Sequence, residues 1–597
     1  MNDMIYRSRL ERHEKELKDL YMELYGNEAM YESLLAGLEH CYAQRSGRLK
    51  ARDSEKEGTD WYKSENLLGM MLYIDNFAGN LKGVREKLDY LEQANVNYIH
   101  LMPFLDTVPE RSDGGYAVAD FRKVRPDLGT MEDLEALTER CHEKGMNICM
   151  DFVMNHTSED HEWARRARAG EGRYMSRYFF YADPSVPTAY EKTVPQVFPT
   201  TAPGNFTWLP DAEHYVMTTF YPYQWDLNYA NPVVFNEMMY NFLYLANRGV
   251  DVVRVDATPY IWKAIGTSCR NLPQVHTIMR MMRLIGEIVC PSVILLGEVV
   301  MAPEYLAPYF GTVEKPECHL LYNATTMATT WHTVATGDTR LLRLQLDTVS
   351  RLPKEQVFLN YLRCHDDIGW GLDYPTLRWW GMEEVPHKKY LNDYFRGRTG
   401  SDARGELYNE DLTTGDARLC GTTASLCGLE GDGKDTAIRK ITMLHAMMLF
   451  QSGIPVLYSG DEIGQLNDWD YKLDPNKAQD SRYLHRGKMP WDRVKELDNP
   501  ASSQAKIFHA LGRLEIIRKT HPAFSSQAEF WTFDTGSEQV LGIARYHQGE
   551  LLIGCFNFGE SEYVLKKQSR MVRDLLTGEA YSREIILRGF DYIWLSA

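Results

Sequence analysis

The stretch GVDVVRVDATPYIW, residues 249–262, is an apolar run that ends with Arg254 and Asp256 two positions apart. Such a run predicts a buried β-strand, and because side chains alternate between the two faces of a strand, both residues should project the same way. A guanidinium beside a carboxylate favours the ionised form of that carboxylate. We therefore expect Asp256 to be charged at neutral pH, although a purely structural ion pair fits this spacing alone equally well.

Three other apolar runs also end in acid, amide or imidazole groups. They are DFVMNHT (151–157), ILLGEVV (294–300) and FLNYLRCHDDIGW (358–370). Together with residues 249–262, their order and spacing match the four signature regions of the alpha-amylase superfamily, glycoside hydrolase family 13. One such region would be a weak signal, but four in order are specific. The chain therefore resembles that family.

The resemblance implies three catalytic carboxylates. Asp256 would be the nucleophile, Glu298 the general acid/base and Asp366 a stabiliser of the transition state, while Arg254 would orient Asp256. A retaining glycosidase needs one carboxylate that attacks the anomeric carbon and one protonated carboxyl that donates to the leaving oxygen. Glu298 follows an apolar strand end, which would help it to stay protonated as the acid.

Within the family, five stretches resemble the amylosucrases, which cleave sucrose and build α-1,4-glucan, and the similarity extends over nearly the whole chain. The stretches are LYIDNFAGNLKGV (72–84), SDGGYAV (112–118), QWDLNYANP (224–232), WKAIGTSCRNLPQVH (262–276) and HDDIGW (365–370). This similarity implies that Asp113 and Arg482 form a salt bridge that closes the far side of a blind pocket for one glucosyl unit. The other residues implied around the substrate are Tyr116 beneath the sugar, His156 and His365 on its hydroxyls, and Phe220, Gln224, Asp367 and Arg418 along the pocket and its acceptor side.

Two positions depart from the amylosucrase pattern. Pro195 and Lys388 stand where that pattern has acceptor-side arginines. Proline has no side-chain donor, and lysine offers a mobile point charge instead of a planar fork. We therefore expect weaker capture of the acceptor, short products and measurable hydrolysis.

The functional hypothesis is a retaining α-glucosyl transfer that cleaves sucrose, releases fructose and passes glucose to an α-glucan, a maltooligosaccharide or water. A sucrose hydrolase and a general α-glucosidase remain alternatives. A non-catalytic binding subunit is disfavoured, because all three carboxylates are present. No cofactor and no metal are expected. Asn155 occupies the position that binds calcium in α-amylases, but a lone asparagine more often serves as a hydrogen-bonding group.

The composition fits a soluble protein with several domains. The 597 residues are 44% hydrophobic and 25% charged, and the formal charge of −17 repels nucleic acid and anionic membranes. The charged N-terminus lacks a signal core, and the ten scattered cysteines form no CxxC pair, which favours reduced thiols and a cytoplasmic location. Residues 441–460 are apolar but broken by Gly453 and Pro455, so they predict a buried helix followed by a strand. A monomer or a homodimer is expected.

Alternation of strand-like and helical patterns predicts an α/β fold, a (β/α)8 TIM barrel. The eight expected strand runs are 70–75, 98–104, 147–153, 250–256, 293–299, 318–323, 357–366 and 454–462. The expected barrel comprises residues 66–154, 233–368 and 435–522, with inserted domains at 155–232 and 369–434. Residues 1–65 should form a helical domain packed on the barrel, and residues 523–597 a C-terminal β-sandwich.

Overall fold

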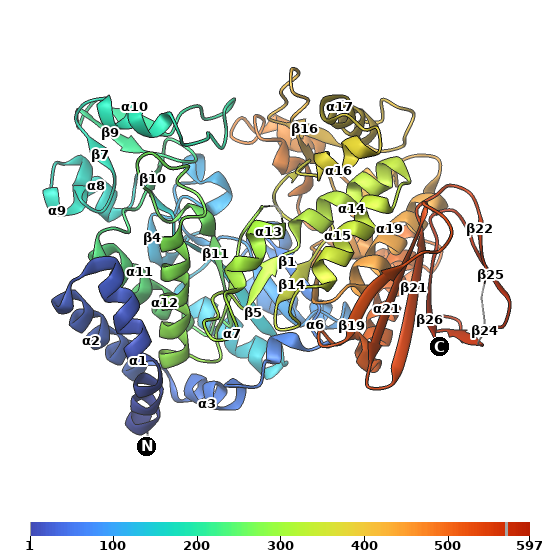
Figure 1. Ribbon diagram of the computed structural model, residues 1–597, viewed down its shortest axis with the longest axis horizontal. Coiled ribbons are helices and arrows are strands. Elements are labelled where there is room, and N and C mark those ends of the chain that lie inside the picture. The colour runs from blue at the N-terminus through green and yellow to red at the C-terminus, as the bar shows by residue number, and fades with distance from the viewer. Residues whose placement is uncertain (1, 302, 567–570) are drawn as a thin grey trace.

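Eight parallel strands form a closed barrel in the computed structural model, which describes residues 2–301, 303–566 and 571–597 (Figure 1). The strands are β1 (Gly69–Leu72), β2 (Tyr98–Leu101), β5 (Asn147–Val153), β11 (Val252–Asp256), β12 (Ile294–Gly297), β13 (Leu320–Tyr322), β14 (Val357–Asn360) and β18 (Ile454–Tyr458). Every residue of these strands is buried, as expected for a sheet covered on both faces. The expected barrel fold is confirmed.

Helices cover the outside of the barrel in sequence order. They are α4 (Ile74–Ala78), α5 (Leu81–Glu86) and α6 (Leu88–Gln93) after β1, α7 (Met131–Glu143) after β2, α11 (Pro232–Ala246) after β5, α12 (Pro273–Val289) after β11, α14 (Ala324–Thr336) and α15 (Arg340–Ser350) after β13, α19 (Lys434–Phe450) after β14, and α20 (Trp491–Val494) and α21 (Ser503–Thr520) after β18. The buried helix and strand expected within residues 441–460 are α19 and β18.

Two details differ from the expected units. The strand β14 ends at Asn360, so Asp366 lies on the following loop and not at the strand end. Among the described residues after β12, only the short helix α13 (Pro303–Leu306) and a single 3-10 turn (Ala307–Phe310) precede β13. The run after β14 continues past the strand because Tyr361, Leu362 and Arg363 of the following loop are also buried.

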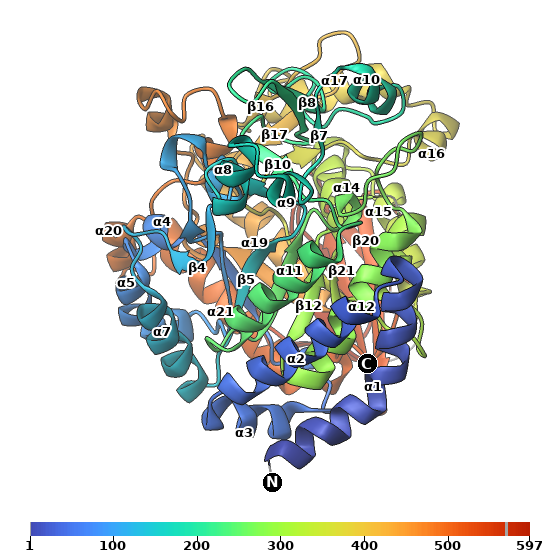
Figure 2. The ribbon, with the colours of Figure 1, turned by 90° about the vertical axis from the view of Figure 1, so that its left-hand side faces the viewer.

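Three N-terminal helices pack on the side of the barrel, as expected. They are α1 (Asn2–Tyr25), α2 (Glu28–Gln44) and α3 (Gly47–Lys56), and Figure 2 shows α2 running beside α11 and α12. The Arg45 Nε lies 2.6 Å from Asp53 Oδ2 in a fully buried ion pair, and Arg45 also donates to the backbone oxygen of Ala246 at the end of α11. The pair joins the end of α2 to α3, and the hydrogen bonds from Arg45 to Ala246 and from the Ser292 hydroxyl to Asp53 tie the extension to the barrel.

Two insertions lie over the C-terminal end of the barrel, at the top of Figure 1. The first contains β6 (His156–Ser158), α8 (Glu162–Arg168), α9 (Gly172–Met175), β7 (Phe180–Tyr181), α10 (Ser185–Glu191), β8 (Phe206–Leu209), β9 (His214–Met217) and β10 (Gln224–Asp226). The second contains β15 (Ile368–Gly369), α16 (Tyr374–Trp379), α17 (Glu384–Phe395), β16 (Glu406–Tyr408), β17 (Arg418–Cys420) and α18 (Thr423–Leu426). They contact each other where the hydroxyls of Tyr221 and Tyr408 lie 2.9 Å apart. A short hairpin, β3 (Leu105–Asp106) and β4 (Asp120–Val124), borders the same end.

The C-terminal part is built from two antiparallel sheets. The larger contains β19 (Glu529–Phe533), β20 (Val540–His547), β21 (Glu550–Asn557), β26 (Tyr592–Ser596), β23 (Val572–Asp574) and β24 (Ala580–Tyr581), and the smaller contains β22 (Tyr563–Lys566) and β25 (Glu584–Leu587). A shared apolar cluster that includes Val540, Cys555, Ile585 and Leu587 joins the two sheets into layers.

The ten cysteines are all free thiols, and nine of them are buried. Of the helices in the described part of the chain, none combines the length and the apolar character needed to cross a membrane.

Candidate active site

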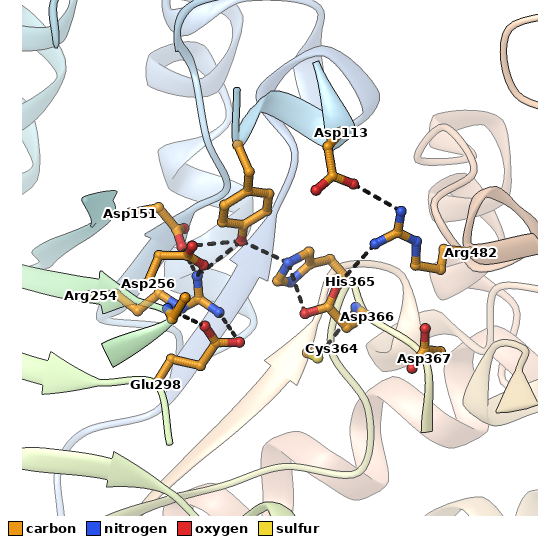
Figure 3. Close-up of polar contacts among 12 residues, drawn as sticks. Asp113, Asp151, Arg254, Asp256, Glu298, Cys364, His365, Asp366, Asp367 and Arg482 are labelled. Atoms are coloured by element: carbon orange, nitrogen blue, oxygen red, sulfur yellow. Dashed lines mark hydrogen bonds and ion pairs between the residues drawn. The ribbon is translucent and has the colours of Figure 1, made fainter. Parts of the chain in front are cut away.

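The Arg254 guanidinium lies between three carboxylates from three neighbouring strands (Figure 3). Its Nη1 contacts Asp151, on β5, and lies 2.6 Å from Asp256 Oδ1, at the end of β11. Its Nη2 lies 2.8 Å from Glu298 Oε1, directly after β12. Parallel register explains this grouping, because Arg254 is paired with Asp151 across the sheet. The expected pairing of Arg254 with Asp256 is therefore confirmed, but the same guanidinium also contacts Asp151 and Glu298.

This sharing changes the expected charge of Asp256. Burial and the adjacent Glu298 raise the pKa of Asp256 well above its ordinary value, and Arg254 only partly opposes the shift. The expectation that Arg254 alone keeps this carboxyl ionised is wrong for the free protein. One positive charge cannot balance three carboxylates, so burial and the neighbouring acid dominate at Asp256.

Glu298 is held by donors on both of its oxygens. Oε1 faces Arg254, and Oε2 accepts a 2.8 Å hydrogen bond from the backbone N–H of Ala257. Ala257 adopts a left-handed conformation with φ 46°, which is uncommon for a residue with a Cβ and turns this N–H toward Glu298. The chain immediately after β11 therefore positions both members of the carboxyl pair.

Asp366 faces the pair from the loop after β14. Its Oδ2 lies 3.3 Å from His365 Nε2, and its Oδ1 lies 3.5 Å from Arg486 Nη2 and 3.8 Å from Arg482 Nη1. Burial alone would raise the pKa of Asp366, but His365, Arg482 and Arg486 lower it below the ordinary range. Burial also lowers the pKa of His365 to about 3, so His365 is neutral at pH 7 and the two guanidiniums keep Asp366 ionised.

Tyr116 connects the two groups of residues. Its hydroxyl lies 2.7 Å from His365 Nε2 and 3.1 Å from Asp151 Oδ1, and its ring stacks on the His365 imidazole with ring centres 5.4 Å apart.

Both ring nitrogens of His156 have a partner within the protein. Nε2 lies 3.2 Å from the Tyr116 carbonyl and Nδ1 lies 3.2 Å from Asn155 Nδ2. Burial lowers the pKa of His156 to about 4, so it is neutral. His365 keeps Nδ1 buried and without a partner.

The expected salt bridge between Asp113 and Arg482 is present. Arg482 Nη2 lies 3.0 Å from Asp113 Oδ1, and the Gln224 amide donates to Asp113 Oδ2 at 3.3 Å. Burial raises the pKa of Asp113 despite the charge of Arg482. A second carboxylate, Asp480, lies 2.7 Å from the same nitrogen of Arg482. Arg482 thus contacts Asp113 and Asp480 through Nη2 and Asp366 through Nη1, and Figure 3 shows its contacts with Asp113 and Asp366.

Both insertions add aromatic and charged groups to the surroundings of the site. The Phe220 ring packs at 5.3 Å from both His156 and Tyr260. Arg418 is half-exposed and makes a single 3.3 Å contact with Asp367. Burial raises the pKa of Asp367.

The two positions that depart from the amylosucrase pattern differ in their placement. Lys388 is buried and its Nζ lies 2.8 Å from Glu384 and 2.5 Å from Asp416, so it is bound within the second insertion. The Pro195 carbonyl accepts a hydrogen bond from Arg270. Two of the three donors of the Lys388 ammonium are therefore engaged by carboxylates within the insertion.

Three charged residues of the site were not singled out from the sequence: Asp151, Asp480 and Arg486. Asp151 begins the DFVMNHT stretch, and Asp480 and Arg486 lie two residues before and four after Arg482. For Asp480 and Arg486 the sequence offers one signal, which is that they are close to Arg482. A group of charged residues in a loop ordinarily indicates a solvated surface, so this signal is weak.

Comparison with known proteins agrees with this geometry. The family model described as alpha amylase, catalytic domain, matches residues 49–367, which is more than half of the chain and includes Asp256 and Glu298. The chain belongs to the alpha-amylase family.

Relatives within the family include several named activities. A glucosylglycerate phosphorylase of Allomeiothermus silvanus is 30% identical over 83% of this chain and 84% of its own length. A trehalose synthase of Thermus thermophilus is 27% identical over 88% of this chain, and the chain spans about half of that protein's length, 53%. The solved trehalulose synthase MutB of Pseudomonas mesoacidophila has the same fold, with a TM-score of 0.68 at 19% identity over 90% of this chain and 99% of its own.

A lysine ammonium occupies the neighbourhood of Asn155, the calcium-binding position of α-amylases. Lys263 Nζ lies 2.8 Å from Asn155 Oδ1, 2.6 Å from the Tyr260 carbonyl and 3.0 Å from Asp226 Oδ2, and both charged side chains are fully buried. The ammonium thus satisfies the oxygen atoms that a cation would otherwise bind.

Another group of potential metal ligands, found in the described part of the chain, is Cys364, His365 and Asp366. It lies beside Arg482 and Arg486, whose charges repel a cation. These three residues are better explained as part of the carboxylate site.

The Lys263 ammonium should be essential to stability. Lys263→Met is expected to cost about 3–5 kcal/mol, because it leaves the Asp226 carboxylate buried without its partner. Thermal and urea denaturation measure this loss, and Lys192→Met, at an exposed position, is the matched control. The double variant Lys263→Met, Asp226→Asn should recover part of the loss. An increase in the wild-type Tm on adding calcium would contradict this account.

The buried Asp256 carboxyl should lower the free energy of unfolding at neutral pH. Its folded pKa is raised, so the unfolded chain ionises first once the pH exceeds about 4, and stability then falls as the pH rises toward the folded pKa. Asp256→Asn removes this penalty, so its Tm should exceed the wild-type Tm at pH 7, and the difference should shrink toward pH 4. Melting curves of both proteins between pH 4 and pH 7 test whether the difference in Tm grows as the pH rises. Asp432→Asn, at an exposed position, should show no such trend. An Asp256→Asn protein that melts below wild type at pH 7 would contradict the assignment.

Proposed function

We propose that the protein is a retaining α-glucosyl-transferring enzyme that takes its glucosyl unit from sucrose. The observation that carries this proposal is the Asp113–Arg482 salt bridge, which lies beside Asp366 and on the other side of the site from Asp256 and Glu298. A pocket closed on one side favours a terminal glucosyl unit over the interior of a glucan chain. Sucrose as donor rests on the stretches that resemble amylosucrase.

In the first step, Glu298 protonates the bridging oxygen while Asp256 attacks the anomeric carbon, which gives a covalent glucosyl-enzyme. Because burial and Glu298 raise the pKa of Asp256 in the free protein, donor binding must leave Asp256 ionised for the attack. The sugar would bring the leaving oxygen next to Glu298 and displace the contacts of its carboxylate. Asp366, kept ionised by Arg482 and Arg486, would stabilise the positive charge that develops on the sugar ring.

In the second step, an acceptor hydroxyl or water attacks the glucosyl-enzyme and Glu298 takes its proton, with net retention. Because Lys388 is bound internally, the acceptor side offers fewer fixed donors than the amylosucrase pattern, and water should compete better. Glucose and short oligosaccharides are the expected products beside any polymer.

A second candidate is phosphorolysis of glucosylglycerate. The glucosylglycerate phosphorylase relative, with similarity over 83% of this chain, favours it. The two candidates share the first step and differ in the leaving group and the acceptor. Trehalose and maltose are further possible donors, given the trehalose synthase relatives.

A donor panel tests the proposal. Purified protein is incubated separately with sucrose, trehalose, maltose and glucosylglycerate, each with and without phosphate. Released fructose, glucose, glycerate and glucose 1-phosphate are then quantified. We expect kcat/KM for sucrose to be at least about tenfold above the other donors, without a phosphate requirement. Phosphate-dependent release of glycerate with inert sucrose would overturn sucrose as the donor and leave the second candidate.

A maltoheptaoside blocked at its non-reducing end tests the pocket shape in the same assay. The Asp113→Asn, Arg482→Gln double variant, which lacks the salt bridge between these two residues, is assayed beside the wild type. Wild type should leave the blocked substrate intact, whereas rapid internal cleavage would indicate an open cleft.

A further inference from the structure

Arg270 is a cation beside the candidate active site, and no acidic side chain in the described part of the chain pairs with it. Its contacts among the described residues are one hydrogen bond, from Nη2 to the Pro195 carbonyl at 3.2 Å, and one ring contact, with its Cζ 4.9 Å from the centre of Tyr260. Its Nε is buried and has no hydrogen-bond partner. A buried donor on a charged group without a partner is costly, so it points to a missing ligand.

The backbone holds this side chain in a fixed place. Cys269 and Asn271, on either side of Arg270, both adopt left-handed conformations with φ 53° and 56°. Such conformations are uncommon for a residue with a Cβ, especially at Cys269, and strain of this kind gathers at functional sites. Cys269 N–H is fixed by the Thr267 hydroxyl, and Asn271 N–H donates to the Pro259 carbonyl. Arg270 is therefore presented by a constrained loop.

Tyr260 connects Arg270 to the catalytic pair. The Tyr260 ring is in contact with Phe220, which packs on His156. Burial raises the pKa of Tyr260, and Arg270, Glu298 and Arg418 are the charged groups that act on its hydroxyl. Arg270 thus lies against a residue that follows Asp256 by four positions, in the turn after β11. Two guanidiniums that act on Tyr260, one without an ion-pair partner, create a positive potential on the acceptor side.

We propose that Arg270, together with Arg418, binds the oxyanion of a negatively charged acceptor, which then receives the glucosyl unit from Asp256. This inference rests on the proposed function and specifies the acceptor class of the same site. A planar guanidinium with free N–H groups suits a carboxylate or a phosphate, because it can make two parallel hydrogen bonds. A neutral glucan would leave this charge unused.

The transfer step balances without a further reactant. An acceptor hydroxyl oxygen forms a bond to the anomeric carbon as the bond from that carbon to the Asp256 carboxylate breaks, and the hydroxyl proton passes to Glu298. Where the acceptor is hydrogen phosphate, one of its oxygens attacks and its own proton is transferred. The products are a glucosylated hydroxy acid in the first case and glucose 1-phosphate in the second.

The test compares acceptors that differ in charge. With whichever donor the enzyme cleaves, product partition is measured with lactate, with 1,2-propanediol, which has a hydroxymethyl group in place of the carboxylate, and with inorganic phosphate. Lactate or phosphate should capture the glucosyl unit at least about tenfold better than the diol, at equal concentration and ionic strength. Arg270→Gln should abolish this preference, and Arg270→Lys should keep part of it. Arg583→Gln, at an exposed position in the C-terminal part, is the charge-matched control.

Donor cleavage in the absence of added acceptor separates the possible failures. If wild type cleaves no donor, the proposed function fails. If it cleaves a donor but prefers the diol to lactate and phosphate, or if Arg270→Gln keeps the preference for anions while it hydrolyses the donor normally, this inference is overturned. Capture by phosphate alone would identify an inorganic acceptor, and capture by lactate alone a hydroxy acid.

Discussion

The site is organised by one guanidinium that neighbouring barrel strands force to serve three carboxylates. Arg254 points from β11 toward Asp151 on β5 and Glu298 after β12, while Asp256 ends its own strand. Parallel register places these groups together whatever the loops contain, and their burial prevents water from screening them. Burial and this shortage of positive charge raise the pKa of Asp256, which favours a proton on that carboxyl. A reaction that needs one protonated and one ionised carboxyl can use that proton, so the stability lost by burying the pair is consistent with a catalytic role.

The barrel alone does not complete the pocket. Asp113 follows β2, whereas Arg482 and Arg486 follow β18, and the two insertions supply Phe220, Gln224 and Arg418. These segments meet only because parallel strands of a closed barrel direct their following loops to one end. The hydroxyl contact between Tyr221 and Tyr408 joins the insertions above that end. The barrel strands position the carboxyls of Asp151, Asp256 and Glu298, whereas the loops supply the other side chains around them.

Much of this arrangement could be predicted from the sequence. Apolar runs located all eight strands, and the spacing in VVRVD predicted the pairing of Arg254 with Asp256. The boundary at β14 could not be predicted, because the residues after Asn360 are as buried as the strand itself. The raised pKa of Asp256 depends on Glu298 and Asp151, whose proximity comes from register and not from local sequence. Asp480 and Lys263 were missed for the same reason: a charged residue reveals its partner only when the fold brings the two together.

Trapping the covalent intermediate tests the central claim most directly. In Glu298→Gln, α-glucosyl fluoride needs no acid to leave, and the second step lacks its base, so the glucosyl-enzyme should accumulate. Mass spectrometry of the intact protein, followed by peptide mapping at low pH, should find one hexosyl group on Asp256. The same experiment with Asp256→Asn should give no adduct. A hexosyl group on Asp366 or Asp151, or rapid fluoride release without any adduct, would contradict the assignment of Asp256 as the nucleophile.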